Sequence, residues 1–497
     1  MVRIWAVCME LGGREWYLEA EIEEMRMATE KQSEIFVFDD LAPEDAGMIQ
    51  ALYSRSPASV VTHLDKVRDV GSGKFMASYY VGYGHQSIGD CGVTIVFMEN
   101  YSMLAAKAIQ DNPLYSGQEA STRYLDFAEQ PLHDPYNHPA SRAILDGWMT
   151  LYNTTMPKMI AALMADHPHD EAAHGSEKKW ENALKARAFD VMRGFLPLGT
   201  TTLFSWTTNL RQARAKILQL KPHPLPENRA LGAELFAALK EKYPNSFTGD
   251  ELEEGGRFAE RDAYWAADSE RDNFVSVADL VAEEWLSAAD LERVKAGEVL
   301  VDKNLMDAAR LNKHEHASLA QRPKGAEVNR RLAAYGTYLV HCLIDFGSFR
   351  DLQRHRNGVC QVPLVEDVCG IHPWYLGQVE TLLGAETYAR FKAEADRLME
   401  AIADLANHGV ETTPLMSQYL YPMGTAIVAQ MAYGFPQMVY VAELRSQATV
   451  HATLRPVALA MGYSVKEDVP SMALYLDESP DGWVAKRGEQ TIEAKVA

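Results

Sequence analysis

Apolar and polar segments follow the same order in two stretches of the chain. In each, an apolar, strand-like run precedes a run with helical spacing, and a polar segment comes next. The first stretch, within residues 91–124, contains CGVTIVFMENYS, MLAAKAIQDN and SGQEASTRY, and the second, residues 335–367, reads YGTYLVHCLIDFGS, FRDLQRHRNG and VCQVPLVED. The pattern predicts a strand followed by a helix in each half and indicates an internal duplication.

The two halves also end alike. Residues 192–221 read MRGFLPLGTTTLFSWTTNLRQARAKILQLK, and residues 417–446 read SQYLYPMGTAIVAQMAYGFPQMVYVAELRS. Each half has a proline-marked turn, LPLGT or YPMGT, and we expect this turn to lead into a long amphipathic helix with a basic residue near its end, Lys221 or Arg445. The shared x-P-x-G-T entrance favours duplication over chance similarity.

An acidic segment separates the halves. Residues 246–313 contain GDELEEGGRFAERD and VADLVAEEWLSAADLERVKAGE, which are helix-prone and carry few strand signals. We therefore predict a first domain at 1–245, an acidic helical linker or insert at 246–313, and a second domain with a C-terminal tail at 314–497. The predicted fold class is α+β, with a sheet flanked by helices in each half and the acidic segment wrapping or bridging them.

Charge narrows the range of partners. The 497 residues carry a formal net charge of −21, which argues against nucleic acid and anionic membrane because both require basic patches. Against this background four basic side chains fall within seven residues: Arg350, Arg354, His355 and Arg356. A run of this kind is most often a solvated helix face, but its apolar flanks favour a local pocket for a small anion.

The N-terminus and the cysteines indicate a cytoplasmic protein. The apolar run in MVRIWAVCMELGGREW is too short for the core of a signal peptide, and no later segment is long enough to span a bilayer. The five cysteines contain no C-x-x-C pair, so we expect reduced thiols, with neither a disulfide framework nor a zinc site.

Several motifs together resemble those of flavin-dependent thymidylate synthases. That family carries R-H-R followed by E-x-S-x-R-Y, with G-H-x-[ST] upstream and N-x-R on a later helix. Here R-H-R occurs in the second half at residues 354–356, but Val362, Leu364 and Glu366 stand where E-x-S-x-R should follow. The first half instead has EASTRY at residues 119–124, with Asp111, Asn112 and Pro113 in place of R-H-R.

The remaining motifs divide between the halves in the same way. The first half keeps GHQS at residues 84–87, Arg193 before the L-P turn, and Asn209-x-Arg211, while Gln418, Gly434 and Pro436 are the corresponding residues of the second. The late helical arginine of the family matches Arg445, opposite Leu220 or Lys221. Each half thus keeps the motifs that the other has lost.

The resemblance implies two tandem thymidylate synthase-like domains that form one composite site, and a homodimer that imitates the family's tetramer. The reaction that the resemblance implies is the FAD-dependent methylation of dUMP to dTMP with methylenetetrahydrofolate and NADPH. Arg445, stabilising charge on the pyrimidine, and Arg354 are the implied catalytic residues. The implied dUMP contacts are Asp351, Arg354, Glu119, Ser121, Arg123, Arg193 and Arg445. The implied FAD contacts are Ser87, His85, Glu119, Asn209, Arg211, His355 and Arg356.

Two of these assignments remain open. His85 is equally consistent with a hydrogen-bonded core histidine. For Arg445 the motif order favours the catalytic role over the alternative, an arginine that caps or pairs at a helix end. Asp351 replaces the family's glutamine, and its carboxylate would repel a nucleotide phosphate unless a cation such as Arg350 neutralises it. No G-x-G-x-x-G fingerprint is visible, which argues against a Rossmann fold but not against flavin binding.

Two other functions compete with this interpretation. The chain could bind flavin or nucleotide, or act on another pyrimidine, without making dTMP, because fold alone does not define function. A metal hydrolase is suggested by histidines in DHPHDEAAH and HEH, but they lack the H-E-x-x-H spacing, so a polar surface loop is favoured and no metal site is predicted.

Overall fold

The structure, a computed structural model, describes residues 35–57, 59–249, 252, 263–264 and 274–479. By contacts the chain divides into units at residues 1–42 and 43–497, and the helices and strands that the structure describes belong to the second unit. The stretch MVRIWAVCMELGGREW, with Cys8, lies outside the described residues, as does GDELEEGGRFAERD apart from Gly249 and Leu252. The four cysteines that the structure describes are free thiols.

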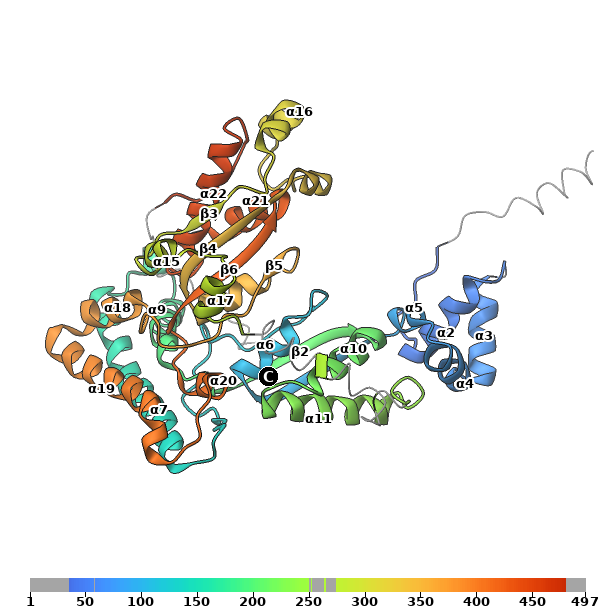
Figure 1. Cartoon of the computed structure of the whole chain (residues 1–497), viewed down its shortest axis with the longest axis horizontal. Helices are drawn as coiled ribbons and strands as arrows, with labels where there is room; N and C mark the ends of the chain where they lie inside the picture. The colour runs from blue at the N-terminus through green and yellow to red at the C-terminus, as the bar shows by residue number, and fades with distance from the viewer. Residues whose placement is uncertain (1–34, 58, 250–251, 253–262, 265–273, 480–497) are drawn as a thin grey trace, which may run out of the picture. The chain divides into compact units, whose positions relative to one another are not determined.

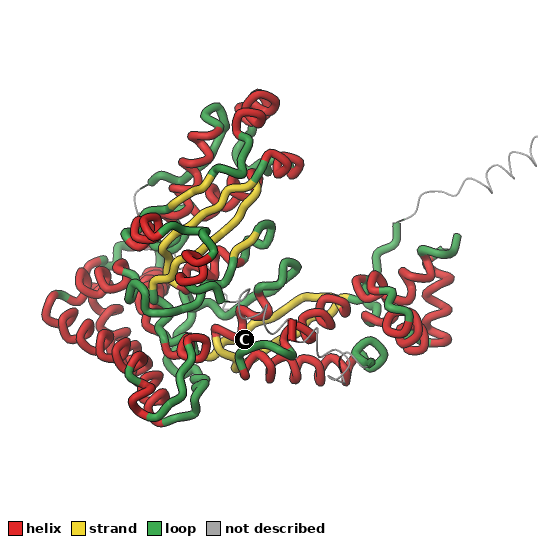
Figure 2. Tube along the Cα trace, viewed as in Figure 1, coloured by secondary structure: helices red, strands yellow, loops and turns green. Residues whose placement is uncertain are grey.

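The fold is α+β, with small antiparallel sheets among helices, and Figure 2 shows the strands in two groups. Before the first sheet come α2 (Pro43–Tyr53), α3 (Val60–Val70), α4 (Gly73–Phe75), η1 (Met76–Gly82) and α5 (Gln86–Asp90). The first sheet and its helices are β1 (Val93–Ser102), α6 (Met103–Gln110), α7 (Pro139–Asp166), α8 (Glu171–His174), α9 (Glu177–Met192), η2 (Arg193–Phe195), β2 (Thr201–Asn209), α10 (Leu210–Leu220) and α11 (Pro226–Lys242).

The acidic segment contributes helices and one short strand. It contains α14 (Val277–Ala282), α15 (Ala288–Lys295) and β3 (Leu300–Asp302). Strand β3 pairs with β4 (Thr337–Asp345), and Leu280, Leu291 and Val294 pack with Val428 of the same sheet. Part of the predicted linker therefore covers the second sheet.

The second sheet has the order β3-β4-β6-β5. The other helices and strands of this part of the chain are α16 (Ala308–Ala320), η4 (Arg330–Tyr335), α17 (Phe346–Gln353), β5 (Val359–Cys360), α18 (Pro373–Leu383), α19 (Ala385–Ala403), η5 (Leu405–His408), α20 (Pro414–Ser417), η6 (Gln418–Leu420), β6 (Ala426–Gly434), α21 (Phe435–Arg445) and α22 (Arg455–Asp468). Among the residues that the structure describes, no helix is both long and apolar enough to cross a membrane.

The strand–helix pairs recur with corresponding strand pairings, except that the register of β1 against β2 shifts between Glu99 and Tyr101. In the first repeat (residues 93–220), β1 pairs with β2 from Val93 opposite Asn209 to Ser102 opposite Thr201. In the second repeat (residues 337–445), β4 pairs with β6 from Thr337 opposite Gly434 to Asp345 opposite Ala426. Helices α6 and α17 both begin after a side-chain cap, from Ser102 and Asp345, so the strand–helix pairs predicted from the sequence are present.

The elements that come after the two proline turns differ from our expectation. Each turn leads first into a strand, β2 or β6, and only then into a helix, α10 or α21. β2 carries four threonines and pairs along β1, so tertiary pairing and β-branched residues outweigh the helical spacing. Helix α10 begins only after Asn209, whose side chain accepts the backbone N–H of Gln212.

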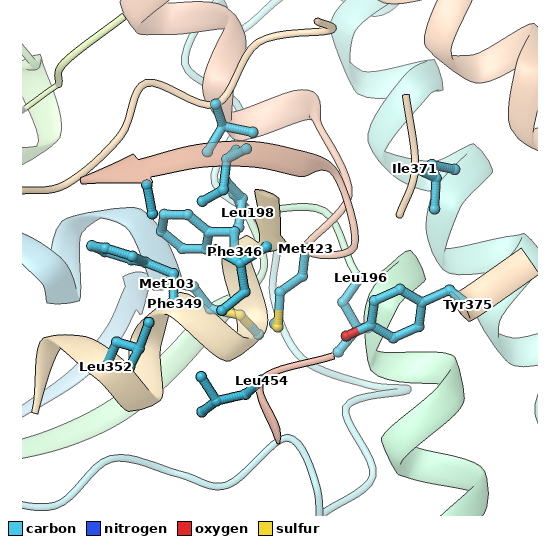
Figure 3. Packing of buried hydrophobic residues seen from close by; sticks show 14 of the residues in the cluster. Met103, Leu196, Leu198, Phe346, Phe349, Leu352, Ile371, Tyr375, Met423 and Leu454 are labelled. Carbon is cyan, nitrogen blue, oxygen red and sulfur yellow. The ribbon is translucent and has the colours of Figure 1, made fainter. Parts of the chain in front are cut away.

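The two repeats join through these proline turns. Pro197 and Pro422, which occupy equivalent places, form an antiparallel bridge with each other. Helix α19 also packs along α7 (Figure 1). Figure 3 shows Met103, Leu196 and Leu198 of the first repeat among Phe346 and Met423 of the second, within one buried cluster. Because this buried cluster contains side chains of both repeats, groups from both can be held at a shared site.

Candidate functional site

A cavity of about 420 Å³ lies between elements of the two repeats. The first repeat contributes the end of α6, the following loop and β2, while the second contributes α17 and the loop after it. The lining residues are Gln110, Tyr115, Ser116, Gly117, Gln118, Glu119, Ser205, Thr207, Arg350, Gln353, Arg354 and Arg356. Its volume is that of a small-molecule site.

Glu119 is the buried carboxylate of this cavity, with a side chain that is 3% exposed. It forms ion pairs with Arg350 and with Lys107, whose Nζ lies 3.2 Å from Oε2, and it accepts Gln110 Nε2 at 2.9 Å. Burial alone would raise the pKa of Glu119, but Arg350 and Lys107 lower it to about 2. The carboxylate is therefore ionised at any working pH.

The cations that hold Glu119 come from equivalent places in the repeats. Lys107 lies in α6 and Arg350 in α17, each five residues after the residue that caps its helix, Ser102 or Asp345. Burial lowers the pKa of Lys107 to about 8 despite Glu119. We did not predict Lys107, and from the sequence we placed Arg350 only in the basic run and as a possible partner for Asp351. The aligned MLAAKAIQ and FGSFRDLQ were the signal that could have identified them.

Two arginines of the R-H-R motif line the cavity with Glu119. Half of the Arg354 side chain is exposed, and its Nε lies 3.9 Å from Asp351 Oδ1. The guanidinium of Arg356 lies over the ring of Tyr115, 5.6 Å from its centre. Burial lowers the pKa of Arg356 only from an already high value, so both side chains offer positive charge to a ligand.

A second cluster of cations surrounds Asp351. Burial would raise the pKa of this carboxyl, but nearby guanidinium groups lower it, in decreasing order of effect Arg445, Arg193, Arg123 and Arg354. These are the four arginines that the resemblance implies for dUMP, and they come from both repeats. The structure thus places them around a carboxylate, and Arg350 pairs with Glu119 instead of neutralising that carboxylate.

Arg445, the last residue of α21, holds the R-H-R loop. Its Nε donates to His355 Nε2 at 2.8 Å, and its Nη2 donates to the Asp351 carbonyl at 2.7 Å. Burial and the Arg445 charge lower the pKa of His355 to about 3, so the imidazole is neutral and accepts this hydrogen bond. Burial also lowers the pKa of Arg445.

Arg123 and Arg193 already have acidic neighbours. Arg123 binds Asp190 through two hydrogen bonds, Nε to Oδ1 at 2.6 Å and Nη2 to Oδ2 at 3.1 Å. Arg193 is buried, donates to Ser348 Oγ at 3.2 Å, and lies 4.0 Å from Asp345 Oδ1. Burial lowers the pKa of Arg193, but Tyr375, Asp345 and Asp190 raise it by more. We did not predict the two aspartates, because nothing in the local sequence marks them.

The other implied contacts have local roles in this structure. Ser121 Oγ accepts the backbone N–H of Arg123 at 3.3 Å, Arg211 pairs with Asp90 at 2.6 Å, and Asn209 caps α10. His85 and Ser87 are exposed, so the alternative of a core histidine at position 85 is wrong. Of the site residues that the resemblance implies, Glu119, Arg354 and Arg356 line the cavity. The others, all described by the structure, are not among its lining residues: His85, Ser87, Ser121, Arg123, Arg193, Asn209, Arg211, Asp351, His355 and Arg445.

The histidines of DHPHDEAAH interact with the backbone. His169 Nε2 lies 2.8 Å from the Gly175 carbonyl, and His174 Nδ1 accepts the Asp170 N–H at 3.0 Å. Within the described part of the chain, no group of three or more potential ligands from histidine, cysteine and acidic side chains could hold a metal ion.

Comparison with known proteins gives a match to one protein family. Residues 42–245 match the family model described as "Thymidylate synthase complementing protein". A UPF0159 protein of Chlamydia pneumoniae is 26% identical over 79% of this chain and 78% of its own length. A UPF0159 protein of Thermoplasma acidophilum is 23% identical over 86% of this chain and 94% of its own, and one of Chlamydia muridarum is 23% identical over 79% and 78%.

Proposed function

We propose that the chain is a flavin-dependent thymidylate synthase, because its residues 42–245 match the family model described as "Thymidylate synthase complementing protein". The proposed reaction consumes dUMP, methylenetetrahydrofolate and NADPH and yields dTMP, tetrahydrofolate and NADP⁺. FAD would carry the electrons from NADPH. We further propose that the acting unit is a homodimer in the cytoplasm, with one composite site per chain.

One observation carries this proposal. Glu119 of the first repeat and Arg354 and Arg356 of the second, which belong to half-motifs far apart in the sequence, line the same cavity. Half-motifs that were lost at random would have no reason to converge. Their convergence supports a working site made from two incomplete halves, and it favours an enzyme over a scaffold.

The residues present fit anionic ligands. Arg354 and Arg356 would hold phosphate groups through their guanidinium donors, since these stay charged at any working pH. Tyr115, buried under Arg356, offers an aromatic face to the same cavity. His85, Ser87, Asn209 and Arg211 remain proposed FAD contacts by resemblance alone.

Arg445 would stabilise negative charge that develops on the pyrimidine ring. It is held in place by the neutral His355 and the Asp351 carbonyl, so its guanidinium needs little reorganisation during the reaction. A fixed cation in a largely buried site acts more strongly than one in water. The protein cysteines have no part in this scheme.

The first test is the visible absorption spectrum of the purified full chain, recorded after gel filtration with and without added FAD. Flavin bands that persist, together with dUMP-dependent reoxidation of the reduced flavin, are the expected result. Arg356→Ala should weaken FAD binding at least about tenfold, and the exposed-helix variant Arg390→Ala should not. A colourless protein that does not bind FAD would overturn the assignment.

One observation favours the competing function, a flavin or nucleotide protein without thymidylate synthase activity. The arginines implied for dUMP face Asp190, Asp345 and Asp351, so their charge is largely compensated before a phosphate arrives. A chain that binds FAD but neither binds dUMP nor oxidises its flavin with it would establish this alternative. Titration of the FAD-loaded chain with dUMP distinguishes the two functions.

A further inference from the structure

We propose that the second repeat carries a separate site for a nucleotide-like ligand, a phosphorylated compound with an aromatic ring. The site is a cavity of about 480 Å³ between the loop at residues 322–330 and helix α21. It is distinct from the composite cavity, because the two sets of lining residues have no residue in common. Asn357 lines this cavity, whereas Arg354 and Arg356 line the composite cavity. Its volume is within the usual range for small-molecule sites.

Two cations at this cavity are free to bind an anion. Lys324 and Arg330 both line it and are exposed, and neither has an ion-pair partner among the described residues. Two unpaired cations on one short loop suit a phosphate or diphosphate group, which each can approach from water. All three basic side chains of helix α19, by contrast, pair with a nearby acid on the same helix.

Two acidic side chains line the cavity, and one of them already has partners within the protein. Glu443 forms an ion pair with Arg322 and accepts the backbone N–H of Tyr475 at 2.9 Å. Arg322 is 8% exposed, and its Nε is buried without a hydrogen-bond partner in the described part of the chain. Glu327 is the remaining carboxylate of the lining, so the two free cations leave a positive balance.

Aromatic and amide groups supply the rest of a nucleotide site. Tyr440 lines the cavity with 48% of its surface exposed, and Tyr475 also lines it. The exposed ring of Tyr440 suits stacking with a base, whereas the ring of Tyr475 lies under the guanidinium of Arg322, 5.3 Å from the ring centre. Gln437 also lines the cavity and is 8% exposed, and its side chain has no hydrogen-bond partner among the described residues. This amide is the group that we assign to the polar edge of the base.

The start of helix α21, which lines this cavity, differs from the start of its counterpart α10 in the first repeat. In the first repeat, the start of α10 is capped by Asn209, and Arg211 reaches Asp90. The equivalent positions at the start of α21 are Gly434 and Pro436, which can form neither the cap nor the ion pair. Pro436 lines the cavity instead. The second repeat therefore lacks two polar contacts at the helix start that the first repeat has.

The test is isothermal titration calorimetry of the full chain with ADP as the probe. To silence the composite site, ADP is titrated into the Arg354→Ala/Arg356→Ala double variant, where binding at one site per chain should persist. Adding Lys324→Ala and Arg330→Ala should weaken it at least about tenfold, since two charge-assisted contacts are lost. Tyr440→Ala should weaken it, and Glu327→Gln should tighten it by removing a repelling charge.

Matched surface changes, Lys392→Ala and Arg397→Ala on α19, should leave the ADP affinity within threefold of the parent, and circular dichroism checks the fold of every variant. No ADP binding, or an affinity unchanged by the Lys324 and Arg330 substitutions, would overturn the proposal. Pyrophosphate that binds as tightly as ADP would also overturn it, because the aromatic side chains would then contribute nothing. FAD binding is not part of this readout, so the outcome is independent of the proposed thymidylate synthase activity.

Discussion

Leu198 and Met423 occupy equivalent places in the two repeats, and each donates its backbone N–H to a carbonyl of the other repeat. Leu198 binds Tyr421 at 2.9 Å, and Met423 binds Leu196 at 2.7 Å. The next residues repeat the exchange, since Gly199 donates to Tyr419 and Gly424 donates to Gly194. This reciprocal pattern is that of an isologous dimer interface within one chain, and it explains how unlike half-motifs meet.

We predict that this interface tolerates no side chain at its glycines. A Cβ on Gly424 would lie 2.7 Å from the Gly194 carbonyl oxygen, and one on Gly199 would lie 2.5 Å from that of His133. Both obstacles are backbone, so Gly424→Ala and Gly199→Ala should each cost about 1–3 kcal/mol and lower the thermal midpoint.

The matched control is Gly377→Ala in helix α18, where an added Cβ meets nothing within 4 Å. This change should leave the protein as stable as before or slightly more stable, because alanine favours a helix. Equal loss of stability in all three variants, measured by thermal unfolding, would contradict the interpretation of a crowded interface.

We expect Glu119→Gln to destabilise the protein strongly. The change leaves Lys107 and Arg350 buried without their carboxylate, and breaking a buried pair in this way costs about 3–5 kcal/mol. Urea unfolding measures the loss. The exposed pair of Arg293 and Glu298 provides the comparison, and Glu298→Gln should have no measurable effect.

The same variant should change the acid sensitivity of the protein. Glu119 has a folded-state pKa of about 2, against an ordinary value of 4.5, so it stabilises the fold fully above pH 4.5. That stabilisation is lost as the pH falls from 4.5 towards 2, because the unfolded chain takes up the proton first. Glu119→Gln should flatten this part of the curve of stability against pH, and an unchanged curve would refute the assigned pairing.

The order of elements could be predicted from the sequence, but much of the geometry could not. Repetition of apolar runs predicts both strand–helix pairs, and complementary motif loss predicts that Glu119 lies near Arg354. The spacing after Pro197 and Pro422 predicts helices where the structure has strands, since the pairing partners lie about a hundred residues away and local spacing does not reveal them. Asp190 and Asp345 were missed for the same reason: an ion pair between distant segments leaves no local pattern.

His355 should remain neutral far below the ordinary histidine range. Its folded-state pKa is about 3, against 6.5 in the unfolded chain, because it is buried and receives a hydrogen bond from the charged Arg445. NMR of imidazole-labelled protein should show no titration of this residue above about pH 4. Its contribution to stability is present above pH 6.5 and declines as the pH falls below that value.

Arg445→Met tests the cause of that shift. Without the guanidinium the repulsion disappears, and the pKa of His355 should rise, although burial should keep it below 6.5. Titration of the same sample in urea supplies the reference for the unfolded chain. A pKa that does not respond to Arg445→Met would show that the two side chains do not interact in solution.

Asp351→Asn should strengthen dUMP binding. The carboxylate lies among Arg445, Arg193, Arg123 and Arg354. It therefore compensates the positive charge that a phosphate dianion would need for binding. The amide keeps the shape of the side chain, and the Asp351 carbonyl that holds Arg445 is part of the backbone and is unaffected. Removing one negative charge near a dianion should improve affinity about tenfold or more, as measured by calorimetry.

Deoxyuridine, which lacks the phosphate, should bind the variant and the parent equally. An equal gain for both ligands would mean that Asp351 acts on the base or the fold, and no gain for dUMP would mean that the phosphate binds elsewhere.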